Sequence, residues 1–360
     1  MAAYTTIDNP GEYFNTVLYS GNNTAQAVAG VGFQPDWVWL KERNGTEQHN
    51  LYDSVRGVHK RLMADGVNAE YDSDTQLTVF GSDGFSVGSS DAINDAGNTM
   101  VAWNWRAGTA FTNDASSTSI GTLDSAGSSN QEAGFSIVSY TSNGSSNQSV
   151  AHNLGGVPEM IISKNRDSTS ASYNYWTVYH HSLATANDKK LKLNATDASS
   201  TTNEWGDTDP TSTVYSIHTS GDGTTNVSTD KIISYVFRSI TGYSKISSYI
   251  GNGQDTPNGV FIYLGFTPAF ILIKATDSNS WVIVDNKRPA DPNPVDSSLS
   301  ADSSAAEVTG DSNTTFDFLS NGFRTNGNSG NNNSSGQEYI FMAFASSPFT
   351  TSTGIPATAK

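Results

Sequence analysis

The residues that could do chemistry are few and form no recognisable catalytic pattern. The chain has six histidines and no cysteine, which excludes disulfides, Cys-based zinc sites and cysteine catalysis. The only histidine cluster is His180-His181, and neighbouring residues of a strand point to opposite faces, so we expect one packed and one exposed ring. No nucleophile elbow, phosphate-binding loop or zinc-protease motif occurs. The sequence therefore predicts a protein that is not an enzyme and has no cofactor.

Two kinds of site remain open among the acidic residues. Asp72-Ser73-Asp74, Asp207-Thr208-Asp209 and the loop at 220–226 carry the oxygen ligands that Ca²⁺ prefers. None has the spacing of a dedicated calcium loop, so solvated loop acids are the favoured interpretation and structural Ca²⁺ the alternative. A pair of carboxylates for glycoside hydrolysis depends on distance in space and not on sequence, so polysaccharide depolymerisation also stays an alternative.

Tryptophans next to loops could stack on sugar rings. Trp205 lies in the polar stretch NEWGDTDP, where a binding role and a core role are equally compatible with its neighbours. Trp176 and Trp281 begin the strand-like segments WTVY and WVIV, which favours a place in the core. The candidate glycan-stacking residues are Trp205 and Trp176.

The composition favours strands and turns over helices. Only 15% of the 360 residues are charged, and Ser, Thr, Asn and 32 Gly carry most of the polar surface. The net charge of −16 argues against nucleic acid and against anionic membranes as partners. The N-terminal residues lack the basic and apolar regions of a signal peptide, and no apolar run is long enough for membrane insertion. We expect a soluble all-β protein made in the cytoplasm.

One motif occurs three times: Gly-x-x-Pro, five residues, then Lys. The three copies consist of Gly32, Pro35 and Lys41, of Gly155, Pro158 and Lys164, and of Gly265, Pro268 and Lys274. A Tyr-containing strand precedes each copy, and an apolar strand (MVAWNW, IISYVF or YIFMAF) closes each. Copies one and three also share the hairpin signal F-x-S-[D/N]-G-F, whereas copy two keeps only a strand around Tyr215.

This order predicts an internal triplication of a unit of about 110 residues, the usual size of a β-sandwich domain. The predicted fold is three tandem β-sandwich-like domains of jelly-roll or lectin-like type. The boundaries are repeat one at 1–108, a Ser/Thr/Gly-rich linker at 109–133, repeat two at 134–242, repeat three at 243–349 and a polar tail at 350–360. The linker is expected to be extended and partly mobile, and to set repeat one apart. The only helical candidate is Ser54–Ala64.

The motif itself is predicted to be a strand with two apolar faces. Proline fits the start of a strand, and period-two alternation places Trp37, Trp39 and Lys41 on one face and Val38 and Leu40 on the other. A strand in a half-exposed sheet would alternate with polar residues, so both faces should be covered. One cover is the core of the domain. The other is a loop layer, a neighbouring repeat or another subunit.

The repeated phrases resemble a family of virion structural proteins of tailed bacteriophages, known from marine and cyanobacterial phages. The matching phrases include GVGFQPDWVWLKERN, FGSDGFSVGSS, GYSKISSYIGNG, GFTPAFILIK and YIFMAFASSPF, and they cover nearly the whole chain apart from the linker and tail. The resemblance implies a place on the particle surface, as a tail-fibre-like or head-decorating component, and it carries over no catalytic residues.

The expected function is accordingly that of a non-enzymatic virion surface protein, with host attachment as a secondary role. Its expected partners are other capsid or tail proteins, further copies of the same chain with a trimer favoured, and a host cell-surface glycan. Two alternatives stay open: a carbohydrate-binding or polysaccharide-depolymerising module, and a pure capsid cement protein without a ligand.

Overall fold

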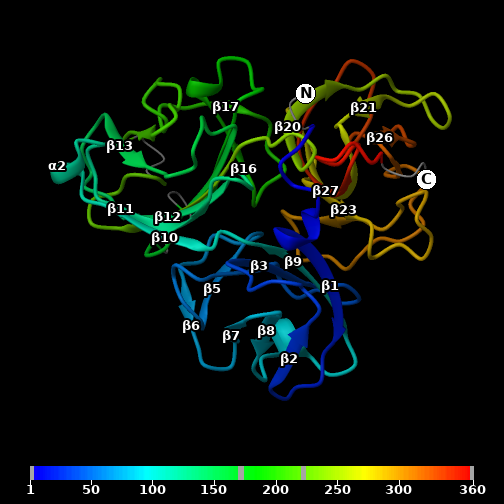
Figure 1. Ribbon diagram of the computed structural model, residues 1–360, viewed down its shortest axis with the longest axis horizontal. Helices are drawn as coiled ribbons and strands as arrows, with labels where there is room; N and C mark the ends of the chain where they lie inside the picture. Colours follow the sequence, from blue (N-terminus) through cyan, green and yellow to red (C-terminus); the bar gives the residue numbers. More distant parts are fainter. Residues whose placement is uncertain (1–3, 169–173, 220–223, 357–360) are drawn as a thin grey trace.

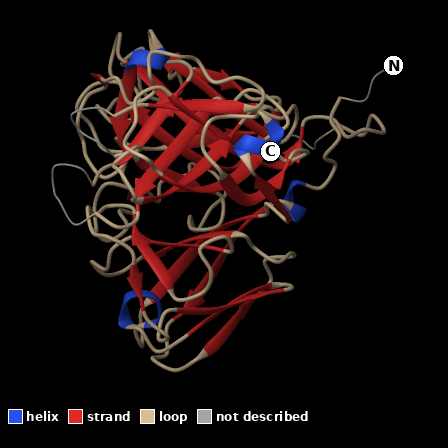
Figure 2. Cartoon of the chain, turned by 90° about the vertical axis from the view of Figure 1, so that its left-hand side faces the viewer, coloured by secondary structure: helices blue, strands red, loops and turns tan. Residues whose placement is uncertain are grey.

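The protein is built from β-sheets joined by long loops, as a computed structural model shows for residues 4–168, 174–219 and 224–356 (Figures 1 and 2). Three large sheets each lie beside a smaller one. Within the described ranges, helices are confined to single turns: α1 (Asp91–Asn94), α2 (Ala115–Thr118), and the 3₁₀ helices η1 (Pro10–Glu12) and η2 (Ala186–Asp188). The predicted all-β class is confirmed.

The first large sheet has the strand order β1-β9-β3-β4-β5-β6. Its strands are β1 (Phe14–Ser20), β9 (Thr99–Trp105), β3 (Trp37–Glu42), β4 (Asn50–Asp53), β5 (Lys60–Met63) and β6 (Tyr71–Asp72). The small sheet beside it consists of β2 (Gln26–Ala29), β8 (Gly84–Val87) and β7 (Leu77–Gly81). Phe80 pairs with Phe85 across β7 and β8, so the hairpin predicted there is confirmed.

The second large sheet has eight strands in the order β10-β11-β12-β19-β14-β15-β16-β17. They are β10 (Thr109–Asn113), β11 (Ser125–Asn130), β12 (Phe135–Thr141), β19 (Lys231–Phe237), β14 (Met160–Asn165), β15 (Trp176–His180), β16 (Lys189–Lys192) and β17 (Ser200–Thr201). In the part of the chain that the structure describes, its small sheet consists of β13 (Gln148–Ala151) and β18 (Val214–Ile217). The missing hairpin signal in copy two thus corresponds to a two-stranded small sheet.

The third large sheet has the order β20-β27-β22-β23-β24. Its strands are β20 (Ser244–Ile250), β27 (Glu338–Pro348), β22 (Phe266–Ala275), β23 (Val282–Asp285) and β24 (Leu299–Ser300). The small sheet contains β21 (Phe261–Tyr263), β26 (Gly322–Thr325) and β25 (Phe316–Leu319), and Phe318 pairs with Phe323 in its hairpin.

All three large sheets share one antiparallel arrangement around the motif strand. The Tyr-containing strand (β1, β12 or β20) pairs with the closing strand (β9, β19 or β27). The closing strand also pairs with the motif strand, and the motif strand pairs with the strand that follows it. The three motif strands β3, β14 and β22 are buried along their whole length. Their apolar character on both faces is therefore explained by burial on both faces.

The two faces pack in different cores. Val38 and Leu40 belong to a core shared with the first small sheet, and Ile271 and Ile273 to a core shared with the third small sheet. Trp37 and Phe270 instead belong to a central core formed by residues of all three large sheets. Figure 1 shows the three lobes around this centre. The second cover, which the sequence analysis left open, is therefore supplied by the neighbouring large sheets.

Three predictions about the arrangement of the chain are wrong. Residues 109–133 are not an extended linker, because β10 and β11 pair with each other and extend the second sheet beside β12. Their Ser/Gly-rich composition has low strand propensity, and tertiary pairing overrides it. The first sheet is also not set apart, since its tryptophans lie in the central core. Residues Ser54–Ala64 form a turn followed by β5 instead of a helix.

Candidate functional site: the contacts between the three sheets

The motif glycines and prolines set the backbone at the start of each motif strand. Gly32, Gly155 and Gly265 have φ angles of 89°, 75° and 84°, a left-handed region that favours glycine. Pro35 and Pro158 precede β3 and β14, while Pro268 lies inside β22 at an irregularity of the β22–β27 register. These residues therefore lie at turns and at the start of the motif strands.

The motif lysines are fully buried and donate to backbone carbonyls. Lys41 Nζ lies 2.7 Å from the Glu42 carbonyl oxygen. Lys164 Nζ lies 2.7 Å from the Asn174 carbonyl oxygen and 3.5 Å from that of Val67, which belongs to the first sheet's loops.

Lys274 repeats this arrangement one sheet further along. Its Nζ lies 2.6 Å from the Asp277 carbonyl oxygen and 3.4 Å from that of Thr196, next to the second sheet. Burial lowers the pKa of Lys164 to about 7 and that of Lys274 to about 8. It also lowers the pKa of Lys41. Lys164 and Lys274 thus lie where neighbouring sheets meet, whereas Lys41 donates to carbonyls of its own segment, those of Glu42 and Gly45.

The buried lysines predict that stability rises with pH above neutrality. Lys164 has a folded-state pKa of about 7, whereas an unfolded lysine titrates near 10.4. Between these values the unfolded chain binds the extra proton, so the free energy of unfolding increases with pH, by at most about 1.4 kcal/mol per unit for each such group. Urea unfolding between about pH 7 and 9 should show this increase.

The variant Lys164→Met tests whether the Lys164 amine contributes to the rise of the unfolding free energy with pH. It is expected to show a smaller rise in unfolding free energy over the same pH range, because it lacks one of the buried amines. Lys231→Met is the matched control, since the Lys231 side chain is 60% exposed. Equal slopes for Lys164→Met and wild type would contradict the assignment.

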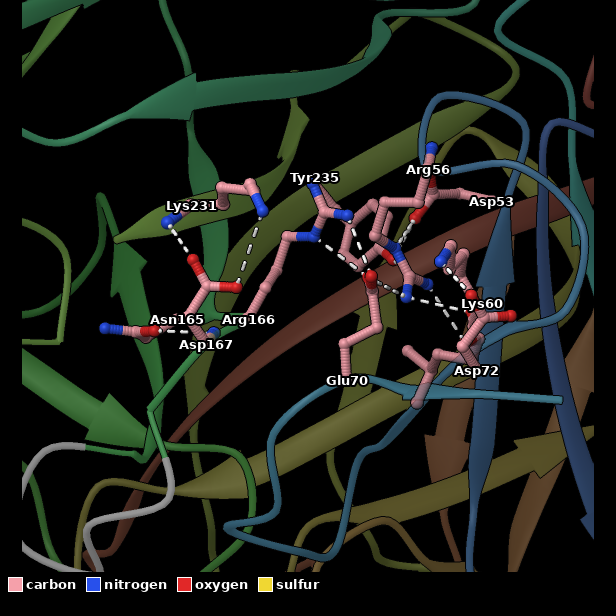
Figure 3. A network of polar contacts seen from close by, with 11 residues as sticks. Asp53, Arg56, Lys60, Glu70, Asp72, Asn165, Arg166, Asp167, Lys231 and Tyr235 are labelled. Carbon is pink, nitrogen blue, oxygen red and sulfur yellow. Dashed lines mark hydrogen bonds and ion pairs between the residues drawn. The ribbon is translucent and has the colours of Figure 1, made fainter. Parts of the chain in front are cut away.

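A buried network of ion pairs joins the first and second sheets (Figure 3). Arg56 Nε lies 2.5 Å from Asp53 Oδ2, and both side chains are fully buried. The Tyr235 hydroxyl of the second sheet donates to the same carboxylate at 2.8 Å. Glu70 contacts Arg56 at 3.2 Å and Arg166 of the second sheet at 2.9 Å. The charges are therefore paired across the contact and do not point into an open cleft.

The same network recurs between the third and first sheets. Arg288 Nε lies 2.6 Å from Asp285 Oδ2, again between fully buried side chains. Trp103 Nε1 of the first sheet donates to Asp285 Oδ2 at 2.8 Å, in the role that Tyr235 has in the first network. Glu307 contacts Arg288 at 2.8 Å and Arg43 of the first sheet at 2.7 Å.

At the contact between the second and third sheets, His180 stands at the position of Asp53 and Asp285. His180 is fully buried, and its Nε2 lies 3.3 Å from the Phe341 carbonyl oxygen. Burial, together with the neighbouring His181, lowers the pKa of His180 to about 3. The His181 ring is exposed and its Nε2 lies 3.0 Å from the Ile246 carbonyl oxygen. One packed and one exposed histidine is what the sequence predicted.

Sequence reasoning missed the ionic residues of these contacts. A usable signal is the spacing Asp-x-x-Arg, which follows the motif strand in copies one and three, at Asp53–Arg56 and Asp285–Arg288. In a turn this spacing lets the carboxylate accept both the backbone N–H and the guanidinium of the arginine, as Asp53 and Asp285 do. Copy two has His180 and Leu183 at these positions and lacks the pair.

Comparison with known protein families gives a match to a domain of unknown function. The profile of a domain of unknown function, DUF7483, matches residues 9–348 and so spans all three large sheets. The chain belongs to this family. No curated protein matches the chain. No helix in the described ranges is long and apolar enough to cross a membrane.

The predicted glycan-stacking tryptophans are not available for stacking in this member of the family. Trp176 is fully buried and its Nε1 donates to the Met63 carbonyl oxygen at 2.7 Å, across the first contact. Trp205 is 2% exposed, packs edge-on against Tyr179 and donates to the Lys189 carbonyl oxygen at 3.0 Å. Both positions are wrong as ligand sites, because loop-flanking tryptophans here fill the core.

Acidic loops gather in one place without forming a metal site. A cavity of about 560 Å³ in the third sheet's loops is lined by Asp255, Asp296, Asp311 and Asp317. Asp317 is already engaged by Arg324 and Asn326. Among the described residues, no group of three or more His, Asp or Glu side chains could hold a metal ion. Residues 220–223, part of one of the acidic loops for which Ca²⁺ was the alternative interpretation, lie outside the described ranges.

Proposed function

We propose that the chain is an internal triplication of a sandwich-like unit, with units near 1–108, 134–242 and 243–349. Support comes from the shared strand order of the three large sheets and from equivalent contacts between them. The backbone N–H of Glu70 donates to Arg166, that of Ser199 to Thr276 and that of Glu307 to Arg43. Each unit thus holds the next in the same way, and the third holds the first. One chain would form a trimer-like body.

We further propose that this body is a non-enzymatic structural protein on the surface of a tailed-phage particle, as a tail-fibre-like or capsid-decorating component. The observation that carries the proposal is the use of its buried charges. The two Asp–Arg–Glu–Arg networks, together with the motif lysines Lys164 and Lys274, make contacts between units. Such groups serve rigidity, which suits an assembled particle. That the particle is a phage virion is inferred from the resemblance of the repeated phrases to virion proteins.

The proposed partners are other virion proteins, with host attachment through a surface glycan as an additional role. The three-way core provides within one chain the packing that a trimer of chains would otherwise supply. Further chains are therefore not needed to cover the motif strands. Association of several chains into a homo-oligomer is still part of the proposal.

The test is to find the chain on particles. Purified virions are analysed by mass spectrometry for this chain, and its position is then mapped by labelling or by density in electron cryomicroscopy. Its presence in a regular copy number on the head or tail would support the proposal, and its absence from virions would overturn it. The non-enzymatic part is tested by incubation with host polysaccharide, where sustained release of reducing ends would overturn it.

A further inference from the structure

The segment Thr109–Asn130 has no counterpart in the first and third sheets. It contributes β10, α2 and β11, which extend the second sheet on the far side of β12. Three cavities in the described surface are lined by residues of this segment. The contacts that the three sheets have in common do not require this extra segment. Its surface is therefore a candidate for ligand binding.

One of these cavities has an uncharged lining, in contrast to the acidic composition of the chain. It has a volume of about 440 Å³, within the range of ligand sites, and we call it the Phe111 cavity. Its lining includes Phe111, Asn113, Ile120, Gln131 and Asn153, and none of the described residues that line it is charged. The acidic cavity of the third sheet, with its four aspartates, provides the contrast.

The apolar part of the cavity is a fixed aromatic ring. Phe111 pairs with Gly127 across β10 and β11, and a Cβ atom at Gly127 would lie 2.8 Å from the Phe111 ring. The ring therefore lies over the glycine, where it packs against the central core while staying partly exposed. Ile120, 38% exposed, adds a second apolar group to the lining.

The polar part consists of oriented amides. Gln131 Nε2 lies 3.2 Å from Asn153 Oδ1 and 3.3 Å from the Asn153 carbonyl oxygen. Asn153 Nδ2 in turn donates to Ser129 Oγ at 2.9 Å. A side chain at Gly155 would crowd Gln131, since its Cβ would lie 3.0 Å from Gln131 Cβ. Two exposed amides are thus held beside the aromatic ring and can supply both donors and acceptors.

We propose that the Phe111 cavity binds a neutral saccharide. A sugar ring presents an apolar C–H face, which matches an aromatic ring, and hydroxyl groups, which match amides. A sialylated or sulfated glycan would find no cation in the lining and would approach a chain with a net charge of −16. The inference deepens the host-attachment part of the proposed function.

The test applies the purified full-length chain to an array of immobilised neutral oligosaccharides, built from hexoses and N-acetylhexosamines, beside sialylated and sulfated ones. Saturation-transfer NMR with the same free oligosaccharides measures affinity in solution. Wild type is expected to bind at least one neutral oligosaccharide in preference to the anionic ones. Phe111→Ala should weaken this binding about tenfold, equivalent to about 1.4 kcal/mol, and Phe111→Trp should retain it.

Two further variants keep the result interpretable. Gln131→Ala removes an exposed amide without touching the core and is expected to weaken binding roughly threefold or more. Phe261→Ala removes a phenylalanine that is 46% exposed on β21 of the third sheet and should leave binding unchanged.

Three results would each overturn the inference. They are no binding to any neutral oligosaccharide, binding to anionic glycans only, and binding that neither Phe111→Ala nor Gln131→Ala reduces. Because purified chain is used, this outcome does not depend on whether the chain is found on particles. The saccharide site and the virion location can therefore fail separately.

Discussion

Replacing Arg56 with alanine is expected to lower the free energy of unfolding by about 3–5 kcal/mol. Arg56 is fully buried and pairs with the fully buried Asp53 and with Glu70. Its removal leaves carboxylates in the contact between two sheets without their main counter-charge, and an unpaired buried charge is costly. Urea unfolding followed by tryptophan fluorescence measures the loss as a lower midpoint.

The matched control for this variant is Lys60→Ala. Lys60 also forms an ion pair in the first sheet, with Asp72, but these side chains are 33% and 56% exposed. An exposed pair contributes less than about 1 kcal/mol, so the control should be nearly neutral. Arg288→Ala removes the corresponding residue of the second network and should cost as much as Arg56→Ala. A loss for Arg56→Ala no larger than that for Lys60→Ala would contradict the role given to the network.

The local part of the fold could be predicted from the sequence because strand periodicity is a local property. The alternation Trp37, Trp39 against Val38, Leu40 correctly separated the two faces of β3, and these faces lie in two different cores. What covers the second face could not be predicted in the same way. An apolar face on a strand indicates that the face is buried. It does not indicate which of the other apolar surfaces of the protein packs against it.

The errors have the same physical origin. Composition described residues 109–133 as linker, yet β11 (SAGSSN) forms because β10 and β12 offer hydrogen-bonding partners on both sides. Polar neighbours suggested an exposed Trp205, yet its indole is buried against Tyr179. In both cases the local structure is determined by pairing or packing with residues far away in the chain. Such long-range contacts cannot be predicted directly from a single sequence.

Replacing Trp37 with alanine is expected to cost about 3–5 kcal/mol and to destabilise the whole chain instead of the first sheet alone. Its ring centroid lies 4.4 Å from that of Trp105 in the same sheet and 4.3 Å from that of Tyr235 in the second sheet. It also lies 6.0 Å from the Phe135 ring of the second sheet. The cavity left by alanine would therefore open in the core that the sheets share.

The form of the unfolding transition distinguishes a shared core from three separate domains. If the sheets unfold together, Trp37→Ala shifts a single transition to lower urea, and probes in different sheets report the same midpoint. If each unit were an independent domain, only one of several transitions would move. Tyr71→Ala, which removes an aromatic ring that is 49% exposed on β6, should leave the midpoint almost unchanged and controls for the loss of an aromatic side chain. Because Trp37 contacts rings of two sheets directly, the single shifted transition is the expected result, and separated transitions would show that the central core does not couple the units.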